Sequence, residues 1–174
     1  MDVHLRPAEP GDLGSLTDLW VELVDGQRTY GAHLEGEANR QPASDVIAQY
    51  VHADGLWVAT DRADGDHLVG FVMFHVERGM YEQDVVRGIV ENLYVVDSYR
   101  DHGVGSRLMS VAESALQDRG ASIVGLSVLT GNERARRFYR DRGYHPHRTT
   151  MERRIDDNAG ERTEDRSTNT GDGQ

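Results

Sequence analysis

The chain has 174 residues, enough for one domain with a sizeable hydrophobic core, and it contains no cysteine. Disulfides, thiolate zinc sites and acyl-cysteine intermediates are therefore excluded. Its 30 acidic residues outnumber 19 basic residues, all of them arginine, and the formal net charge of −11 disfavours nucleic-acid binding.

The acidity has two explanations, acidic drift in a GC-rich genome or adaptation to a high-salt cytoplasm. We favour the second, halophilic one, because salt screens the repulsion between acidic surface groups. No window reaches the roughly 18 apolar residues of a membrane span, and the N-terminus lacks the basic-then-apolar pattern of a signal peptide. We therefore expect a cytoplasmic protein that does not bind membranes.

Hydrophobic spacing assigns most of the chain to strands or helices. In chain order the predicted elements are a short strand within 3–12, a helix over about 13–25, a polar loop over 26–41, a helix over 43–53, strands over 56–60, 67–78 and 86–97, a helix over 104–119, a strand over 122–130, a helix over 132–142 and a last strand over 144–155.

This order predicts an α/β (α+β) fold, with a mixed sheet of about six strands, antiparallel in its hairpin half, and about four helices. The domain would span residues 1–155. Residues 156–174 are polar, and we expect them to form a disordered acidic tail.

Two glycines, Gly103 and Gly105, stand between a predicted strand and a predicted helix. Glycine lets the backbone approach a ligand closely, and a helix N-terminus presents unpaired amides and the positive end of its dipole. Arg100 adds a cation, and the region 100–148 holds nine arginines against five acidic residues. The pattern favours a bound phosphate, although such turns also close loops without a ligand.

Three phosphate-binding patterns compete for this turn. A dinucleotide fingerprint requires a third glycine where Leu108 stands, and a P-loop requires a lysine, which the protein lacks. The remaining pattern is R-x-x-G-x-G, from Arg100 to Gly105.

With this last pattern the chain resembles the GCN5-related N-acetyltransferase (GNAT) superfamily. The resemblance rests on two linked segments, ENLYVVDSYRDHGVGSRLM at 91–109 and GNERARRFYRDRGY at 131–144, and covers about residues 3–154. The diamine (spermidine/spermine) acetyltransferase-like branch is nearest. The resemblance implies the GNAT fold and an acetyl-CoA-dependent N-acetyltransferase, an acyltransferase with acetyl-CoA as co-substrate.

The resemblance also implies how acetyl-CoA is bound. Its pyrophosphate would sit on the amides of the glycine turn, and its pantetheine arm would pair with the preceding strand, where a backbone N–H would meet the thioester carbonyl. Asn132 would reach the cofactor, cap the last helix, or do both. The implied binding residues are Leu93, Tyr94, Val95, Arg100, Asp101, His102, Gly103, Val104, Gly105, Ser106, Asn132 and Ala135.

Tyr139 and Glu91 are the implied catalytic residues. The family counterpart of Tyr139 lies near the thioester sulfur, where a phenol can protonate the departing thiolate; the alternative is a core aromatic on an amphipathic helix. Glu91 matches the carboxylate of the diamine-acetylating branch and would deprotonate the amine, directly or through water; the alternative is an exposed, idle carboxylate. Relatives that acetylate ribosomal proteins carry a glutamate on the following strand, where this chain has Ser127.

The expected acceptor is a primary amine of a small molecule, amino acid or peptide, which attacks the thioester directly in a ternary complex. Loops 25–41 and 77–87 would shape its pocket.

No metal site is expected, because His145 and His147 lack a third ligand. Relatives are commonly dimers, so a homodimer is an option. The alternatives are a non-catalytic acyl-CoA-binding regulatory module and, less favoured because of Leu108, a nucleotide-binding oxidoreductase domain.

Overall fold

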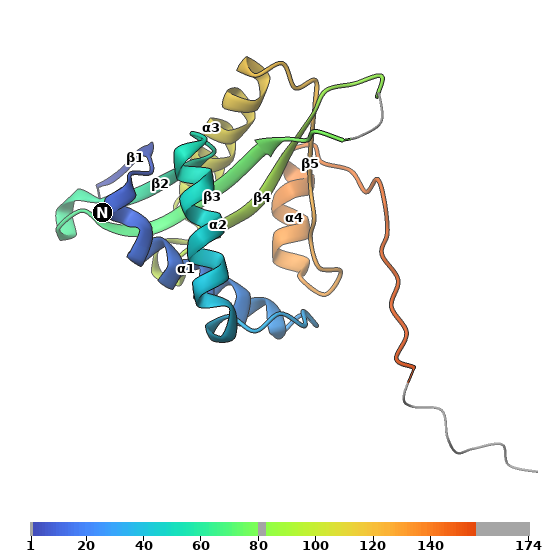
Figure 1. Cartoon of the computed structure of the whole chain (residues 1–174), viewed down its shortest axis with the longest axis horizontal. Helices are drawn as coiled ribbons and strands as arrows, with labels where there is room; N and C mark the ends of the chain where they lie inside the picture. The colour runs from blue at the N-terminus through green and yellow to red at the C-terminus, as the bar shows by residue number, and fades with distance from the viewer. Residues whose placement is uncertain (1, 80–82, 156–174) are drawn as a thin grey trace, which may run out of the picture.

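The computed structural model describes residues 2–79 and 83–155, which form five strands, four α-helices and short 3₁₀ helices (Figure 1). The strands are β1 (Val3–Pro7), β2 (Leu56–Asp61), β3 (His67–Val76), β4 (Arg87–Val95) and β5 (Ile123–Leu126). The helices are α1 (Leu13–Arg28), α2 (Arg40–His52), α3 (Val104–Asp118) and α4 (Glu133–Asp141), with 3₁₀ helices η1 (Pro10–Asp12), η2 (Glu37–Asn39), η3 (Arg62–Asp64) and η4 (Asp97–Tyr99).

The sheet has the order β1-β2-β3-β4-β5, antiparallel from β1 to β4 and parallel between β4 and β5. In Figure 1, α1 and α2 lie in front of the sheet and α3 lies behind it. Leu16 of α1 and Ile47 of α2 pack in one core, and Leu108 and Leu116 of α3 pack in another. We call the two sides the α1/α2 face and the α3 face. The predicted α+β class with a mixed sheet is confirmed.

β3 is the central buried strand, because helices cover both of its faces. Phe71 and Met73 pack on the α1/α2 face, whereas Val72 and Phe74 pack on the α3 face, and each is at most 2% exposed. This strand provides the rigid support against which β4 is placed.

The first two helices are longer than the sequence predicts. α1 extends to Arg28 and α2 begins at Arg40, so both enter the predicted loop over 26–41. Pro42 lies in the first turn of α2, where proline is tolerated because its missing N–H has no helical acceptor there. No helix within the described ranges is long and apolar enough to cross a membrane.

The predicted last strand over 144–155 is wrong, and the predicted strand over 122–130 is reduced to Ile123–Leu126. Met151 and Ile155, two apolar residues of this segment, are 90% and 82% exposed. A strand needs a partner edge, and among the described residues this segment pairs with none. The sheet therefore has five strands here instead of about six. The predicted tail over 156–174 lies outside the described residues.

Candidate active site

β4 extends beyond its parallel partner. Their pairing joins Arg87–Val90 to Ile123–Leu126, and β5 ends there. Within the described part of the chain, residues 91–95 of β4 therefore have β3 on one side and no strand on the other. An unpaired strand edge can exchange hydrogen bonds with an extended ligand, as one strand does with another.

The side chains of residues 93–95 pack against the two hydrophobic cores. Leu93 and Val95 pack on the α3 face, and Tyr94 packs on the α1/α2 face. The Tyr94 hydroxyl donates to Glu22 of α1 at 3.0 Å, and burial together with this bond raises the pKa of Tyr94 to about 12. An extended ligand at this edge would therefore meet the backbone of these three residues.

The turn after β4 has a backbone that suits an anion. Asp101 and Gly103 have φ values of 63° and 78°, in the left-handed region that favours glycine. Gly103 caps α3, and the amide of Arg107 donates to its carbonyl at 3.0 Å. The amides of residues 104–106 precede this bond and have no helical acceptor, so they and the helix dipole favour a negative group.

The fold leaves open space at both glycines of this turn. A Cβ built on Gly103 would meet nothing within 4 Å, and one built on Gly105 would meet no atom closer than 3.8 Å. Core packing therefore does not require glycine at position 105. His102 is exposed beside them, while the Val104 side chain is 2% exposed and anchors the helix start. The open amides fit a pyrophosphate, which needs a close approach of the backbone.

The side chain of Arg100 contacts other residues of the protein. Its Nε donates to the carbonyl of Val95 at 2.8 Å, its guanidinium pairs with Asp97, and it lies over the Tyr94 ring at 5.6 Å from the centroid. These contacts fix the end of β4 to the glycine turn. A bond from Arg100 to a phosphate stays a prediction.

α4 begins with a capped turn next to this region. The side chain of Asn132 accepts a hydrogen bond from the Ala135 amide at 3.0 Å, so the cap that the sequence offered as an alternative is present. Arg134, the second residue of the helix, pairs with Asp101 of the glycine turn at 3.0 Å. The cofactor contacts expected of Asn132 and Ala135 stay predictions.

Tyr139 lies in the second half of α4, half-buried in an aromatic cluster. Its ring centroid is 5.2 Å from that of Phe138 and 5.9 Å from that of Tyr144. Burial raises the pKa of Tyr139 to about 12, so the phenol keeps its proton at neutral pH. Among the described residues its hydroxyl has no hydrogen-bond partner, and a Cβ on Gly105 would be 3.8 Å from the Phe138 ring. A neutral phenol thus lies on a helix that packs against the glycine turn.

Glu91 is an extra residue in β4. Met73 of β3 pairs with Asn92 and Phe74 pairs with Val90, so Glu91 has no opposite residue and forms a β-bulge. Val90 and Leu93 consequently pack on the same α3 face, although strict alternation would separate them. The carboxylate is exposed, at the point where β4 parts from β5.

Two residues that the sequence did not single out lie near Glu91. The Tyr50 hydroxyl is hydrogen-bonded to Nδ1 of His75 at 2.8 Å. Burial and, to a smaller extent, the charge of Glu91 raise the pKa of Tyr50. Val90 packs on the α3 face, so alternation along β4 places its neighbour Glu91 on the α1/α2 face. His75, the one polar side chain within the apolar run 68–76, was the available signal. Among the described residues, no three His, Cys, Asp or Glu side chains gather as metal ligands would.

Comparison with known families identifies the fold. Residues 19–144 match the model of the acetyltransferase (GNAT) family. The chain belongs to the GNAT family. The resemblance inferred from the two sequence segments is thereby confirmed at the level of the superfamily.

Curated relatives of this GNAT protein are N-acetyltransferases. It is 28% identical over 150 residues to thialysine N-epsilon-acetyltransferase of Bos taurus, covering 81% of this chain and 83% of the relative. It is 26% identical over 141 residues to aminoalkylphosphonate N-acetyltransferase of Salmonella typhimurium, covering 81% and 84%.

Solved structures share the GNAT architecture. A GCN5-related N-acetyltransferase from Ralstonia eutropha superposes with a TM-score of 0.69 at 25% identity, covering 88% of this chain and 98% of that one. A transcriptional regulator from Bacillus halodurans superposes with a TM-score of 0.67 at 21% identity, covering 88% and 99%, which is a likeness of fold alone.

Proposed function

We propose that this GNAT protein transfers an acetyl group from acetyl-CoA to the primary amine of a small molecule. The observation that carries the proposal is the convergence of three features: the unpaired edge of β4, the outward amides of residues 104–106, and Tyr139 on the helix packed against that turn. The named relatives support a small-molecule acceptor, because both act on small amines.

Acetyl-CoA would supply the acetyl group as an activated thioester. The amides of the glycine turn would hold its pyrophosphate, and a backbone N–H of residues 93–95 would stabilise negative charge on the carbonyl oxygen. Since the chain has no cysteine, the amine would attack the thioester directly. An alkylamine with a pKa of about 10 is protonated at neutral pH, so Glu91 would first take its proton. Tyr139 would give its phenolic proton to the leaving sulfur.

The test is thiol release from acetyl-CoA at high KCl, against a panel of amines, amino acids and peptides. We expect amine-dependent release, and a kcat lowered by roughly 10²–10⁴-fold in Tyr139→Phe through loss of the general acid. Tyr144→Phe is the matched control: its hydroxyl donates to Glu113 at 2.9 Å, so stability should fall by about 1 kcal/mol with kcat within a few-fold of wild type.

Two other outcomes would change the conclusion. Tight binding of CoA without turnover of any amine would favour the acyl-CoA-binding regulatory module. An equal loss of kcat in both tyrosine variants would refute the specific role of Tyr139. A homodimer and a cytoplasmic location stay predictions, the first of which light scattering would test.

A further inference from the structure

A pocket of about 450 Å³ lies beside the last residues of β3, where β2 no longer accompanies it. The pairing of β2 with β3 stops at Leu56 and Met73, with one further bond from the Phe74 amide to the Gly55 carbonyl at 2.8 Å. The pocket occupies the place that a longer β2 would fill alongside His75. Its walls come from α2, β3 and the C-terminal end of α3.

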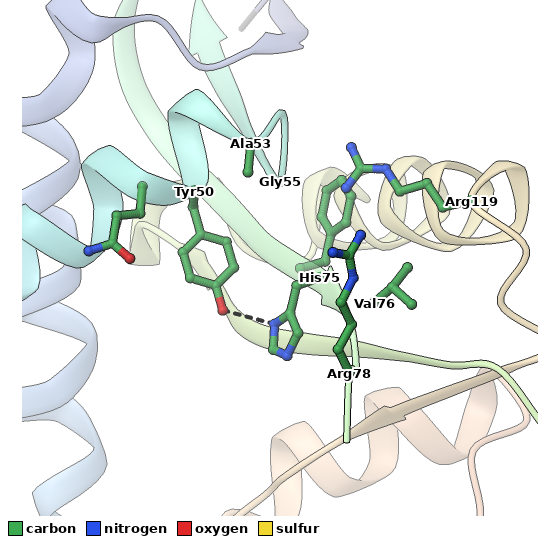
Figure 2. A pocket seen from close by; sticks show the side chains of 9 residues that line it. Tyr50, Ala53, Gly55, His75, Val76, Arg78 and Arg119 are labelled. Atoms are coloured by element: carbon green, nitrogen blue, oxygen red, sulfur yellow. Dashed lines mark hydrogen bonds between the residues drawn. The ribbon is translucent and has the colours of Figure 1, made fainter. Parts of the chain in front are cut away.

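The lining of this pocket is positively charged, whereas the protein as a whole carries a net negative charge. Arg78, which follows β3, and Arg119, which caps α3, both line it. Figure 2 shows Arg119 reaching from α3 and Arg78 from the chain after β3, with their side chains ending in the same region. Among the described residues that line the pocket there is no aspartate or glutamate, although the chain has 30 acidic residues and a net charge of −11. We call it the arginine pocket.

The guanidinium of Arg119 is held in position. It donates to the carbonyl of Asp54 at 2.6 Å and lies over the ring of Phe74, 5.3 Å from the centroid. A guanidinium has several N–H donors, so this bond leaves donors for an anion. A cation fixed on an aromatic floor needs little ordering when a ligand arrives, which favours binding.

The arginine pocket adjoins the candidate base. Tyr50 and His75 line it, and their hydrogen bond forms the wall shown at the centre of Figure 2. His75 pairs with Ile89 on β4, two residues before Glu91. Glu91 and the Tyr50–His75 pair share the α1/α2 face, because Tyr50 packs there and Glu91 alternates with Val90 of the α3 face. Because this pair lines the pocket and His75 pairs two residues from Glu91, an acceptor held at Glu91 would approach the arginines along the pair.

We propose that the arginine pocket binds an anionic group of the acceptor, which is therefore an amine that also carries a carboxylate or a similar acid. The inference rests on the proposed function and specifies its substrate class. The two relatives agree with it, since thialysine is an amino acid and an aminoalkylphosphonate carries a phosphonate.

The experiment compares 6-aminohexanoate with hexylamine as acceptors. We expect wild type to show a KM for 6-aminohexanoate at least roughly tenfold below that for hexylamine, the size of one hydrogen bond to a charged group. Arg78→Gln and Arg119→Gln should each raise the KM for 6-aminohexanoate about tenfold and leave the KM values for hexylamine and acetyl-CoA unchanged. Arg62→Gln is the matched control, an exposed arginine of η3 outside the pocket.

Equal KM values for the two amines in wild type, or unchanged selectivity in Arg78→Gln, would overturn the proposal. Arg119 also bonds the backbone of Asp54, so Arg78→Gln decides if Arg119→Gln does not fold. Calorimetric titration of the protein with 6-aminohexanoate gives a readout that does not depend on turnover. Absence of acetylation would refute the proposed function. Binding of 6-aminohexanoate that Arg78→Gln abolishes would still support the proposal for the arginine pocket. Absence of this binding in wild type would refute the proposal for the pocket.

Discussion

Arg142, which caps the C-terminal end of α4, donates to the carboxylate of Glu113 on α3 at 2.6 Å. The same carboxylate accepts the hydroxyl of Tyr144 at 2.9 Å, and Arg142 also donates to the carbonyl of Ser106 at 3.3 Å. One glutamate thus joins the helix that carries Tyr139 to the helix that begins at the glycine turn.

Glu113→Gln should weaken this junction. The side chains of Arg142 and Glu113 are only 19% and 31% exposed, so we expect the free energy of unfolding in urea to fall by about 1–2 kcal/mol. The KM for acetyl-CoA should rise as α4 loosens from α3. Glu133→Gln is the control, because its pair with Arg136 is exposed and contributes at most about 0.5 kcal/mol. Equal destabilisation in both variants would contradict the argument.

The two glycines of the turn should respond differently to alanine. Gly103 has a φ of 78°, so Gly103→Ala should cost about 1 kcal/mol of stability through backbone strain alone. Gly105 has no positive φ and has space for a Cβ, so Gly105→Ala should leave stability unchanged or raise it by up to about 1 kcal/mol. Both should weaken CoA binding in calorimetry. Unchanged CoA affinity in Gly105→Ala would remove the pyrophosphate from this turn.

Glu91→Gln should impair the reaction most where the amine is protonated. We expect kcat/KM at neutral pH to fall by roughly 10²-fold or more, the range of general-base catalysis. The deficit should shrink as pH rises toward about 10, because the amine then loses its proton to water. Asp64→Asn, on an exposed carboxylate of η3 outside both the acceptor loops and the arginine pocket, is the control. A pH-independent deficit would assign Glu91 to a role other than the base.

Asp61 should contribute to stability against acid. Its buried carboxylate accepts hydrogen bonds from the Asp2 amide at 2.9 Å, the Ala63 amide at 3.0 Å and the Tyr99 hydroxyl at 2.9 Å. These bonds, that from the Asp2 amide first, lower the pKa of Asp61. A carboxyl with a lowered folded pKa contributes stability that is complete above its unfolded pKa of about 3.9 and is lost as pH falls through the folded pKa.

Thermal melting between about pH 7 and about pH 2 tests this linkage. Asp61→Asn should melt below wild type at neutral pH and show a shallower loss in acid, because the linked proton is gone. Asp66→Asn, an exposed residue of the same turn, should follow the wild-type curve. Parallel curves for wild type and Asp61→Asn would contradict the prediction.

Local signals in the sequence were sufficient for most of the fold. Period 3.6 places one set of apolar residues on a single face of the helix over 104–119: Leu108, Val111, Ala112, Ala115 and Leu116. Leu108, Ala112 and Leu116 are fully buried, and Val111 and Ala115 are partly buried. The glycine spacing identified the turn that begins α3, because left-handed φ values there depend on local residue type. Apolar runs likewise identified the central strands, because a strand covered on both faces needs apolar side chains along its length.

Features that depend on distant partners were not predictable from local pattern. The early end of β5, the bulge at Glu91 and the inward Arg100 are set by pairing and contacts across the sheet. The predicted strand over 144–155 is absent because a local segment does not supply its own partner edge, and among the described residues this one pairs with no strand. The arginine pocket likewise joins Arg78 and Arg119, which only the folded chain brings together.

The bulge in β4 means that the core does not need Glu91. A chain without this one residue would run Val90, Asn92, Leu93, Tyr94 in strict alternation, with Val90 and Leu93 still on the α3 face and Tyr94 still on the α1/α2 face. The shortened strand would be the more regular of the two. The irregular strand thus presents a carboxylate where β4 and β5 separate, and we expect a substitution or deletion at this position to leave both hydrophobic cores packed.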